Sequence, residues 1–126
     1  MKFQQKFEAK LFSGEKNITT RLHKKPEYEV GNVYTIDIVR RNAGSVIPII
    51  EFKGYLTIIR NQVWPLGIVL HGDGFPVFPF NMTEGEFLKK EGFSNKDKFI
   101  EFFRTMYPKS FKKIKVATTY QFQVKG

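Results

Sequence analysis

The 126-residue sequence contains no cysteine and only two histidines, His23 and His71. Without thiols the chain cannot form disulfides, thiolate zinc sites or a cysteine nucleophile. Two histidines also make a histidine-based metal site unexpected, so no metal and no cofactor are predicted. The sequence lacks the roughly 18 consecutive apolar residues of a membrane span, and its first ten residues lack the apolar core of an export signal. We therefore expect a cytoplasmic protein with no membrane association.

Acidic residues are also scarce relative to basic ones. The chain has 21 Lys and Arg against 12 Asp and Glu, a net charge of +9, which favours an anionic partner such as RNA. Part of this charge is clustered, above all in the stretch from Lys109 to Lys115. Lys112 and Lys113 in this stretch are candidates for binding substrate phosphates. The alternative is that they only keep the surface soluble.

Length and patterning indicate one domain over residues 1–126. The 14 Phe residues supply enough apolar surface for a packed core. The chain order is helix, strands, two helices and a final strand, which is not a βαβ alternation. It predicts an α+β fold, a mostly antiparallel β-barrel with helices packed at its edges. The expected helices span residues 3–12, 83–92 and 94–107, and the expected strands span residues 17–22, 33–39, 46–50, 54–60 and 114–124.

The central stretch is rich in proline, glycine and aromatic residues. It predicts an irregular insertion around residues 61–82, with one strand around Ile68–Leu70. Aromatic side chains in this insertion either stack on bases or anchor the loop to the core, and His71 is a lone loop histidine. These aromatic residues are Trp64, Phe75, Phe78 and Phe80.

The most informative motif is Phe7-x-x-x-Leu11-x-x-Gly14-x-Lys16-x-x-Thr19-x-Arg21, with Gly31 ten residues later. It resembles the signature of the ASCH family (activating signal cointegrator homology), in which a helix, a Gly-x-Lys turn and a Thr-x-Arg strand follow one another. Within the family the run from Gly14 to Arg21 is most similar to small bacterial N(4)-acetylcytidine amidohydrolases. A second stretch, from Thr83-Glu84 to Tyr107-Pro108, extends the resemblance to about residues 1–40 and 83–124. The resemblance implies a PUA-like β-barrel.

The resemblance also implies that Lys16, Thr19 and Glu91 occupy catalytic positions, with Glu84 and Glu86 as alternatives to Glu91. Strand alternation places Thr19 and Arg21 on one face, and Lys16 in the preceding turn can reach them. A nearby guanidinium would lower the pKa of Lys16, which suits a nucleophile or general base. Glu91 would then protonate the departing amine, and Thr19 with the substrate-binding Arg21 would stabilise the oxyanion.

Three functions are compatible with these residues. The first is an ASCH protein that acts on RNA or a modified nucleoside, in its sharpest form an N(4)-acetylcytidine amidohydrolase. The second is an RNA-binding module without catalysis, in which Lys and Arg bind phosphate and Thr19 contacts a base edge. The third is a ribonuclease. All of them require Lys16, Thr19 and Arg21 to share one hollow.

Overall fold

The computed structural model describes residues 1–41, 44 and 46–125 and has an α+β fold. None of its helices within these residues is long and apolar enough to cross a membrane. Three-residue 3₁₀ turns are labelled η. The elements are β1 (Lys2–Gln4), η1 (Gln5–Phe7), α1 (Glu8–Ser13), β2 (Ile18–Arg21), β3 (Val33–Arg40), β4 (Ile49–Trp64), α2 (Leu66–His71), η2 (Pro79–Asn81), α3 (Glu84–Glu91), α4 (Lys96–Met106), η3 (Phe111–Lys113) and β5 (Ala117–Lys125).

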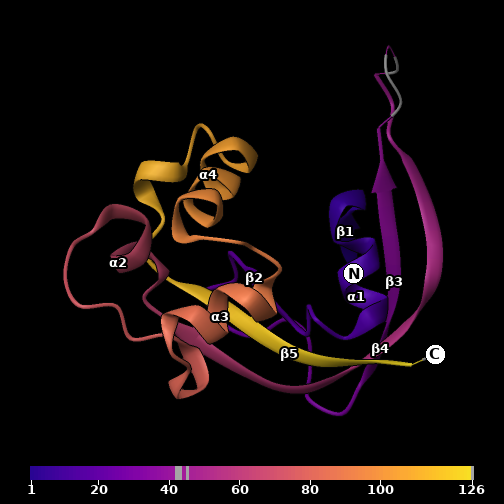
Figure 1. Cartoon of the computed structure of the whole chain (residues 1–126), viewed down its shortest axis with the longest axis horizontal. Helices are drawn as coiled ribbons and strands as arrows, with labels where there is room; N and C mark the ends of the chain where they lie inside the picture. The colour runs from indigo at the N-terminus through magenta and orange to yellow at the C-terminus, as the bar shows by residue number, and fades with distance from the viewer. Residues whose placement is uncertain (42–43, 45, 126) are drawn as a thin grey trace.

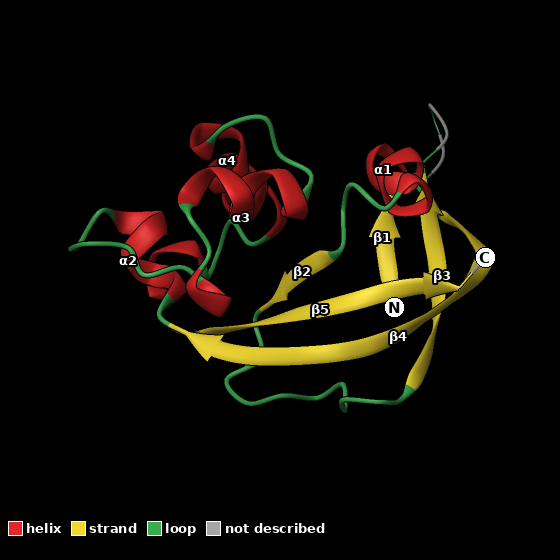
Figure 2. Ribbon diagram, turned by 60° about the horizontal axis from the view of Figure 1, so that its bottom comes forward, coloured by secondary structure: helices red, strands yellow, loops and turns green. Residues whose placement is uncertain are grey.

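The five strands form one curled sheet in the order β1-β3-β4-β5-β2. Three of the four strand pairings are antiparallel, and β1 pairs parallel to β3. The sheet is therefore mixed, and it curls into a half-barrel with β1 and β2 as its two edges (Figure 2). The expected α+β class and the barrel-like curl are confirmed, but the sheet is mixed and forms a half-barrel with a seam between its edge strands.

The curl of the sheet depends on β4, which is one continuous strand instead of the two expected. Its register against β3 shifts between Ile36 and Asp37, and its register against β5 shifts between Ile58 and Arg60. Extra residues of this kind bend a strand and increase its twist. Both ends of β4 can therefore belong to one sheet, with β3 paired to its first part and β5 to its second (Figure 1).

The N-terminal segment differs from the predicted helix over residues 3–12. Residues 2–4 form β1, whose main chain pairs with β3, and the α-helix begins only at Glu8. Phe3 and Phe7 both point into the core. Their spacing of four residues is also that of one face of a helix, which is why the sequence predicted a longer helix. Gly14 ends α1 in the left-handed conformation, with φ of 83°, as glycine commonly does at a helix C-terminus.

Helices α2, α3 and α4 gather at one end of the sheet, away from α1 (Figure 1). Thr83 begins α3 with a capping box to Glu86, and Gly92 ends this helix with φ of 93°. Helix α4 is capped by Asn95, whose side chain accepts a hydrogen bond from the Lys98 N–H. The expected helix began at residue 94, one residue before this cap.

The prediction for residues 61–82 is wrong in two respects. Residues 61–64 belong to β4, and Ile68–Leu70 lies within helix α2 instead of a strand. Pro65 and Gly72 flank this helix, so the breakers mark its ends. Trp64 and Phe78 are core residues, Phe75 is 95% exposed, and the His71 ring packs against Phe111.

Helix α2 is held tightly against the segment that precedes β5. The Gly67 N–H donates to the Lys115 carbonyl at 2.9 Å. A Cβ at Gly67 would lie 2.6 Å from the Ile114 carbonyl oxygen and 3.0 Å from the Lys115 Cα. These neighbours are main-chain atoms, so the two segments would have to separate.

We predict that Gly67→Ala lowers the free energy of unfolding by about 2 kcal/mol, the cost of overpacking a close contact. Gly85→Ala is the matched control, because Gly85 lies in helix α3 with no atom within 4 Å of an added Cβ. That control should be neutral or more stable by up to about 1 kcal/mol. Urea unfolding of both variants measures the difference, and equal effects would contradict the close contact.

Candidate functional site

A small hollow of about 80 Å³ lies at the seam of the half-barrel. Its walls come from both edge strands and from the ends of helices α3 and α4. All four candidate residues of the ASCH-like motif and its second stretch contribute to this hollow. Its lining comprises Lys2, Phe3, Gln4, Phe7, Lys16, Thr19, Thr20, Arg21, Glu91, Phe93, Phe102, Phe103, Met106 and Tyr107.

Lys16 is the buried cation of this hollow, with only 3% of its surface exposed. Its Nζ donates to the main-chain carbonyls of Ile18 at 2.8 Å and Glu91 at 2.6 Å. The same Nζ lies 3.9 Å from the Glu91 carboxylate and 4.8 Å from the centre of the Phe7 ring. One amine thus joins the turn after α1 to the end of α3.

The main chain around Lys16 explains why its side chain points inward. The Lys16 N–H donates to the main-chain carbonyl of Lys10, and the Asn17 N–H donates to that of Lys90. The Asn17 carbonyl accepts a hydrogen bond from the Phe122 N–H. At the other side, a Cβ on Gly92 would lie 3.1 Å from the Phe7 ring and 3.4 Å from the Lys16 Cδ. The absence of a side chain at residue 92 therefore leaves room for both the lysine stem and the aromatic ring.

Burial shifts the protonation of both members of the Lys16–Glu91 pair. It lowers the pKa of Lys16 to about 8, against an opposing effect of the Glu91 charge. Arg21 lowers the pKa of Lys16 further, as expected from the sequence, but this contribution is smaller than burial. Burial likewise raises the pKa of Glu91, which Lys16 partly offsets. Both shifts favour the uncharged forms of the pair.

Arg21 connects the two edges of the sheet. Its Nη2 donates to the Lys2 carbonyl on β1 at 2.7 Å, and its guanidinium lies 5.1 Å from the centre of the Phe3 ring. Thr19, two residues earlier on β2, is buried and lines the same hollow. The structure thus brings Lys16, Thr19, Arg21 and Glu91 together.

Thr20 is a lining residue that the strand alternation missed. Its hydroxyl is 2.6 Å from that of Thr119, which also accepts a hydrogen bond from the Trp64 indole. Alternation assigns Thr20 to the opposite face from Thr19. Both residues nevertheless line the hollow, because β2 is an edge strand and one of its sides is open to the seam.

Two polar atoms of this hollow lack a hydrogen-bond partner within the described part of the chain. They are Glu91 Oε1 and Arg21 Nε, and only two other buried side-chain atoms, on Asn17 and Thr57, share this condition. Buried polar groups are nearly always paired in folded proteins, so an unpaired acceptor and an unpaired donor in one hollow are typical of a ligand site.

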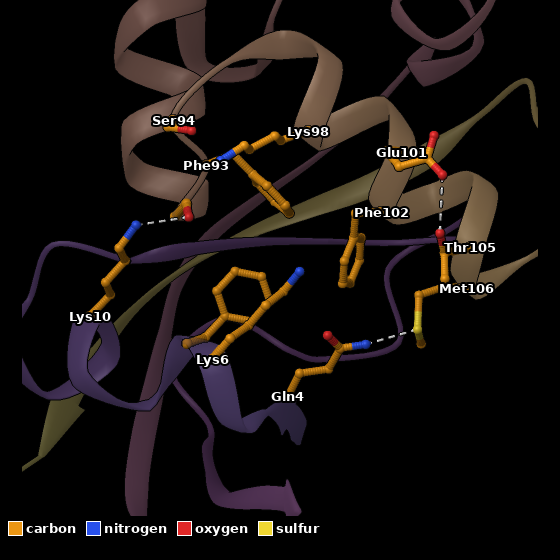
Figure 3. Close-up of a pocket in the computed structure, with 12 residues that line it drawn as sticks. Gln4, Lys6, Lys10, Phe93, Ser94, Lys98, Glu101, Phe102, Thr105 and Met106 are labelled. Atoms are coloured by element: carbon orange, nitrogen blue, oxygen red, sulfur yellow. Dashed lines mark hydrogen bonds between the residues drawn. The ribbon is translucent and has the colours of Figure 1, made fainter. Parts of the chain in front are cut away.

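A larger cleft of about 470 Å³ lies beside the hollow, between η1–α1 and helix α4 (Figure 3). The two spaces share five lining residues, so these side chains form the partition between them. The shared residues are Gln4, Phe7, Phe93, Phe102 and Met106. The Gln4 amide lies 2.9 Å from the Met106 sulfur and links the two sides of the partition. No pattern in the sequence predicted this cleft.

The other candidate residues lie elsewhere. Lys112 and Lys113 are exposed in η3 and line neither of these two spaces. Glu86 belongs to the capping box of α3, and Glu84 is an exposed residue that pairs with Lys96 at 4.0 Å. Glu91 is therefore the carboxylate of the α3 stretch that reaches the hollow.

Within residues 1–41, 44 and 46–125, no group of three or more His, Asp or Glu side chains is arranged to hold a metal ion. Lys16, Glu91, Arg21, Thr19 and Thr20 instead bring an amine, a carboxylate, a guanidinium and two hydroxyls to the hollow. Together they can bind an anion or a polar planar group, and they can exchange protons with it.

No protein family model and no curated protein matches this sequence. Two solved structures are similar in fold. The crystal structure of hypothetical protein PH0355 is similar with a TM-score of 0.55 and 16% sequence identity, over 99% of this chain and 100% of that one. Protein EF3133 from Enterococcus faecalis V583, of family DUF984, is similar with a TM-score of 0.51 and 14% identity, over 90% of this chain and 66% of that one. At these identities the likeness shows a shared fold.

We predict that Glu91→Gln lowers the pKa of Lys16 below about 8, because the variant removes the charge that opposes the effect of burial. Lysine-selective NMR of the side-chain carbon next to Nζ measures the titration. Glu84→Gln is the control, since Glu84 is an exposed carboxylate on the same helix outside the hollow. An unchanged Lys16 titration in Glu91→Gln would contradict the pairing.

Proposed function

We propose that this chain is an ASCH-type, PUA-like domain that hydrolyses N(4)-acetylcytidine to cytidine and acetate. The observation that carries the proposal is the buried Lys16 amine, held by two main-chain carbonyls beside the Glu91 carboxylate. The ASCH-like motif gives the substrate class, since Lys16, Thr19 and Glu91 stand at the catalytic positions of the amidohydrolases that it resembles. The curled sheet and its similarity to two solved folds are compatible with a PUA-like domain.

The hydrogen bonds of Lys16 suit a neutral amine. A neutral amine has two N–H protons and one lone pair, and the carbonyls of Ile18 and Glu91 accept both protons. The lone pair is thereby left free to accept a proton. With a pKa of about 8, roughly a tenth of Lys16 is neutral at pH 7 and about half at pH 8, and this neutral form is what a general base requires.

Glu91 supplies the proton that the reaction needs at its other end. Burial raises the pKa of Glu91, so its acid form is easier to populate than that of an exposed carboxylate, and its unpaired Oε1 is free to contact a ligand. In the proposed reaction, Lys16 takes a proton from water as the water oxygen attacks the acetyl carbon. Glu91 then protonates the departing N4 amine as the C–N bond breaks. A proton transfer from Lys16 to Glu91 restores the starting pair.

The charge that develops on the acetyl oxygen requires donors inside the hollow. The Thr19 hydroxyl and the unpaired Arg21 Nε are the candidates for this role. The hollow of about 80 Å³ suits a group the size of an acetylamide, and the neighbouring cleft of about 470 Å³ has room for the rest of a nucleoside.

We predict that the purified protein releases cytidine from N(4)-acetylcytidine. Chromatography of the reaction products measures this release. Lys16→Ala should lower kcat/KM by about 100-fold or more, the contribution of a general base. In the unmodified protein, kcat/KM should fall by about tenfold per pH unit below about 8, because protonation removes the lone pair.

Lys16→Met preserves the length of the side chain and tests whether loss of activity follows from loss of the amine, with thermal unfolding as the check on the fold. The exposed Lys89→Ala is the matched lysine control. Turnover that persists in both Lys16 variants would rule out the lysine as base, and absence of turnover in the unmodified protein would rule out the reaction.

A second candidate function is RNA binding without catalysis, and a separate groove favours it. This groove of about 560 Å³ is lined by Lys24, Lys113 and Lys115 together with apolar residues. Three cations along one groove can follow a phosphate backbone. Lys113 is one of the two lysines, with Lys112, that the sequence indicates as candidates for binding phosphates.

If RNA uses this groove, Lys113→Gln with Lys115→Gln should reduce the slope of log K against log salt by about 1.4, or about 0.7 per lost phosphate contact on a single strand. The Lys89→Gln and Lys125→Gln pair is a control with the same change in charge on exposed residues outside the groove. Filter binding at several salt concentrations measures the slope. Equal slopes in both pairs would exclude the groove, and cleavage of the labelled RNA would indicate a ribonuclease instead.

A further inference from the structure

The cleft beside the hollow is lined by cations on both of its sides. Lys6 and Lys10 come from η1 and α1, and Lys98 comes from helix α4 (Figure 3). The cleft contains one acidic lining residue, Glu101, and its carboxylate is engaged by Arg104 and Thr105. Among the described residues, no carboxylate forms an ion pair with any of these three lysines.

Two of these lysines, Lys6 and Lys10, are held at the cleft by contacts with other residues. The Lys6 ammonium lies 5.0 to 5.6 Å from the ring centres of Phe7, Phe93 and Phe102. These rings are shared with the deeper hollow. The Lys10 ammonium donates to the Gly92 carbonyl at 3.1 Å. These contacts position Lys6 and Lys10 at the cleft, and Lys98 lines it from the side of α4.

Their mutual repulsion is not balanced within the protein. Burial lowers the pKa of Lys6, and the charge of Lys98 lowers it further. An anion between Lys6 and Lys98 would relieve this repulsion and would find donors from both sides of the cleft. Such an anion would lie next to the aromatic partition behind which Lys16 and Glu91 are located.

We infer that the cleft is a phosphate subsite, and that the substrate is a phosphorylated acetylcytidine, either a nucleotide or a residue of RNA. This inference rests on the proposed function, because it assigns the acetylamide of the base to the hollow. The phosphate on the ribose then lies among Lys6, Lys10 and Lys98. The aromatic residues of the partition contact the ribose and the face of the base. A free nucleoside places its acetylamide in the hollow but leaves the cations of the cleft unmatched.

The test compares kcat/KM for N(4)-acetylcytidine, its 5′-monophosphate and a short RNA with one acetylcytidine. The inference expects a preference of about tenfold or more for the phosphorylated substrates, the effect of charge-assisted hydrogen bonds. In the double variant Lys6→Gln with Lys98→Gln, the ratio of nucleotide to nucleoside should fall to about one. Lys10 is left in place because it also holds α1 to Gly92.

The control pair Lys89→Gln with Lys125→Gln removes the same charge from exposed positions outside the cleft and should keep the preference. Equal kcat/KM for nucleoside and nucleotide in the unmodified protein, or a preference that survives in the Lys6 and Lys98 variant, would overturn the inference. The two phosphorylated substrates distinguish a mononucleotide site from one that needs RNA.

Calorimetry separates this inference from the proposed reaction. If no acetylated substrate is turned over, the reaction is wrong, but cytidine 5′-monophosphate should still bind about tenfold more tightly than cytidine. That difference should disappear in the Lys6 and Lys98 variant and remain in the control pair. Equal affinities for the two ligands would overturn the phosphate subsite independently of catalysis.

Discussion

The site is organised by one interaction, the burial of the Lys16 amine against the carbonyls of Ile18 and Glu91. A buried amine without acceptors would cost several kcal/mol, so the turn after α1 and the end of α3 must stay within its reach. Gly92 makes this approach possible, because any side chain there would meet Phe7 and the stem of Lys16. The position of α3 relative to β2 is thus fixed by the same group that is proposed to carry the chemistry.

The open seam of the half-barrel leaves a hollow beside this amine. In a closed barrel the β1 and β2 main chains would pair with each other, and the space that the hollow occupies would be lost. Here a side chain, Arg21, spans the gap to the Lys2 carbonyl instead. On its other sides the seam is lined by aromatic residues of α4 and the α3–α4 turn, and such apolar surroundings strengthen the electrostatic interactions beside them.

The sequence predicted the local features of the site better than its surroundings. The spacing from Gly14 to Arg21 and the resemblance to the ASCH family identified the four side chains that meet, since caps and strand alternation depend on near neighbours. It did not predict β1 or the outer cleft, because both depend on segments far apart in the chain. Helix α2 was missed because prolines and glycines flank it, and periodicity alone could not show that they mark ends. Lys112 and Lys113 were selected by charge alone, which carries no information on distance from the hollow.

The pairing of β2 has a consequence for the order in which the chain acquires its structure during synthesis. Strand β2 pairs only with β5, although about a hundred residues separate Thr19 from its partner Tyr120. Strands β1, β3 and β4 can associate as soon as residue 64 has left the ribosome, whereas β2 must wait for residues 117–125. Such distant contacts form late and slowly. The nascent protein therefore carries Lys16 outside any finished pocket until nearly all of the described chain has emerged.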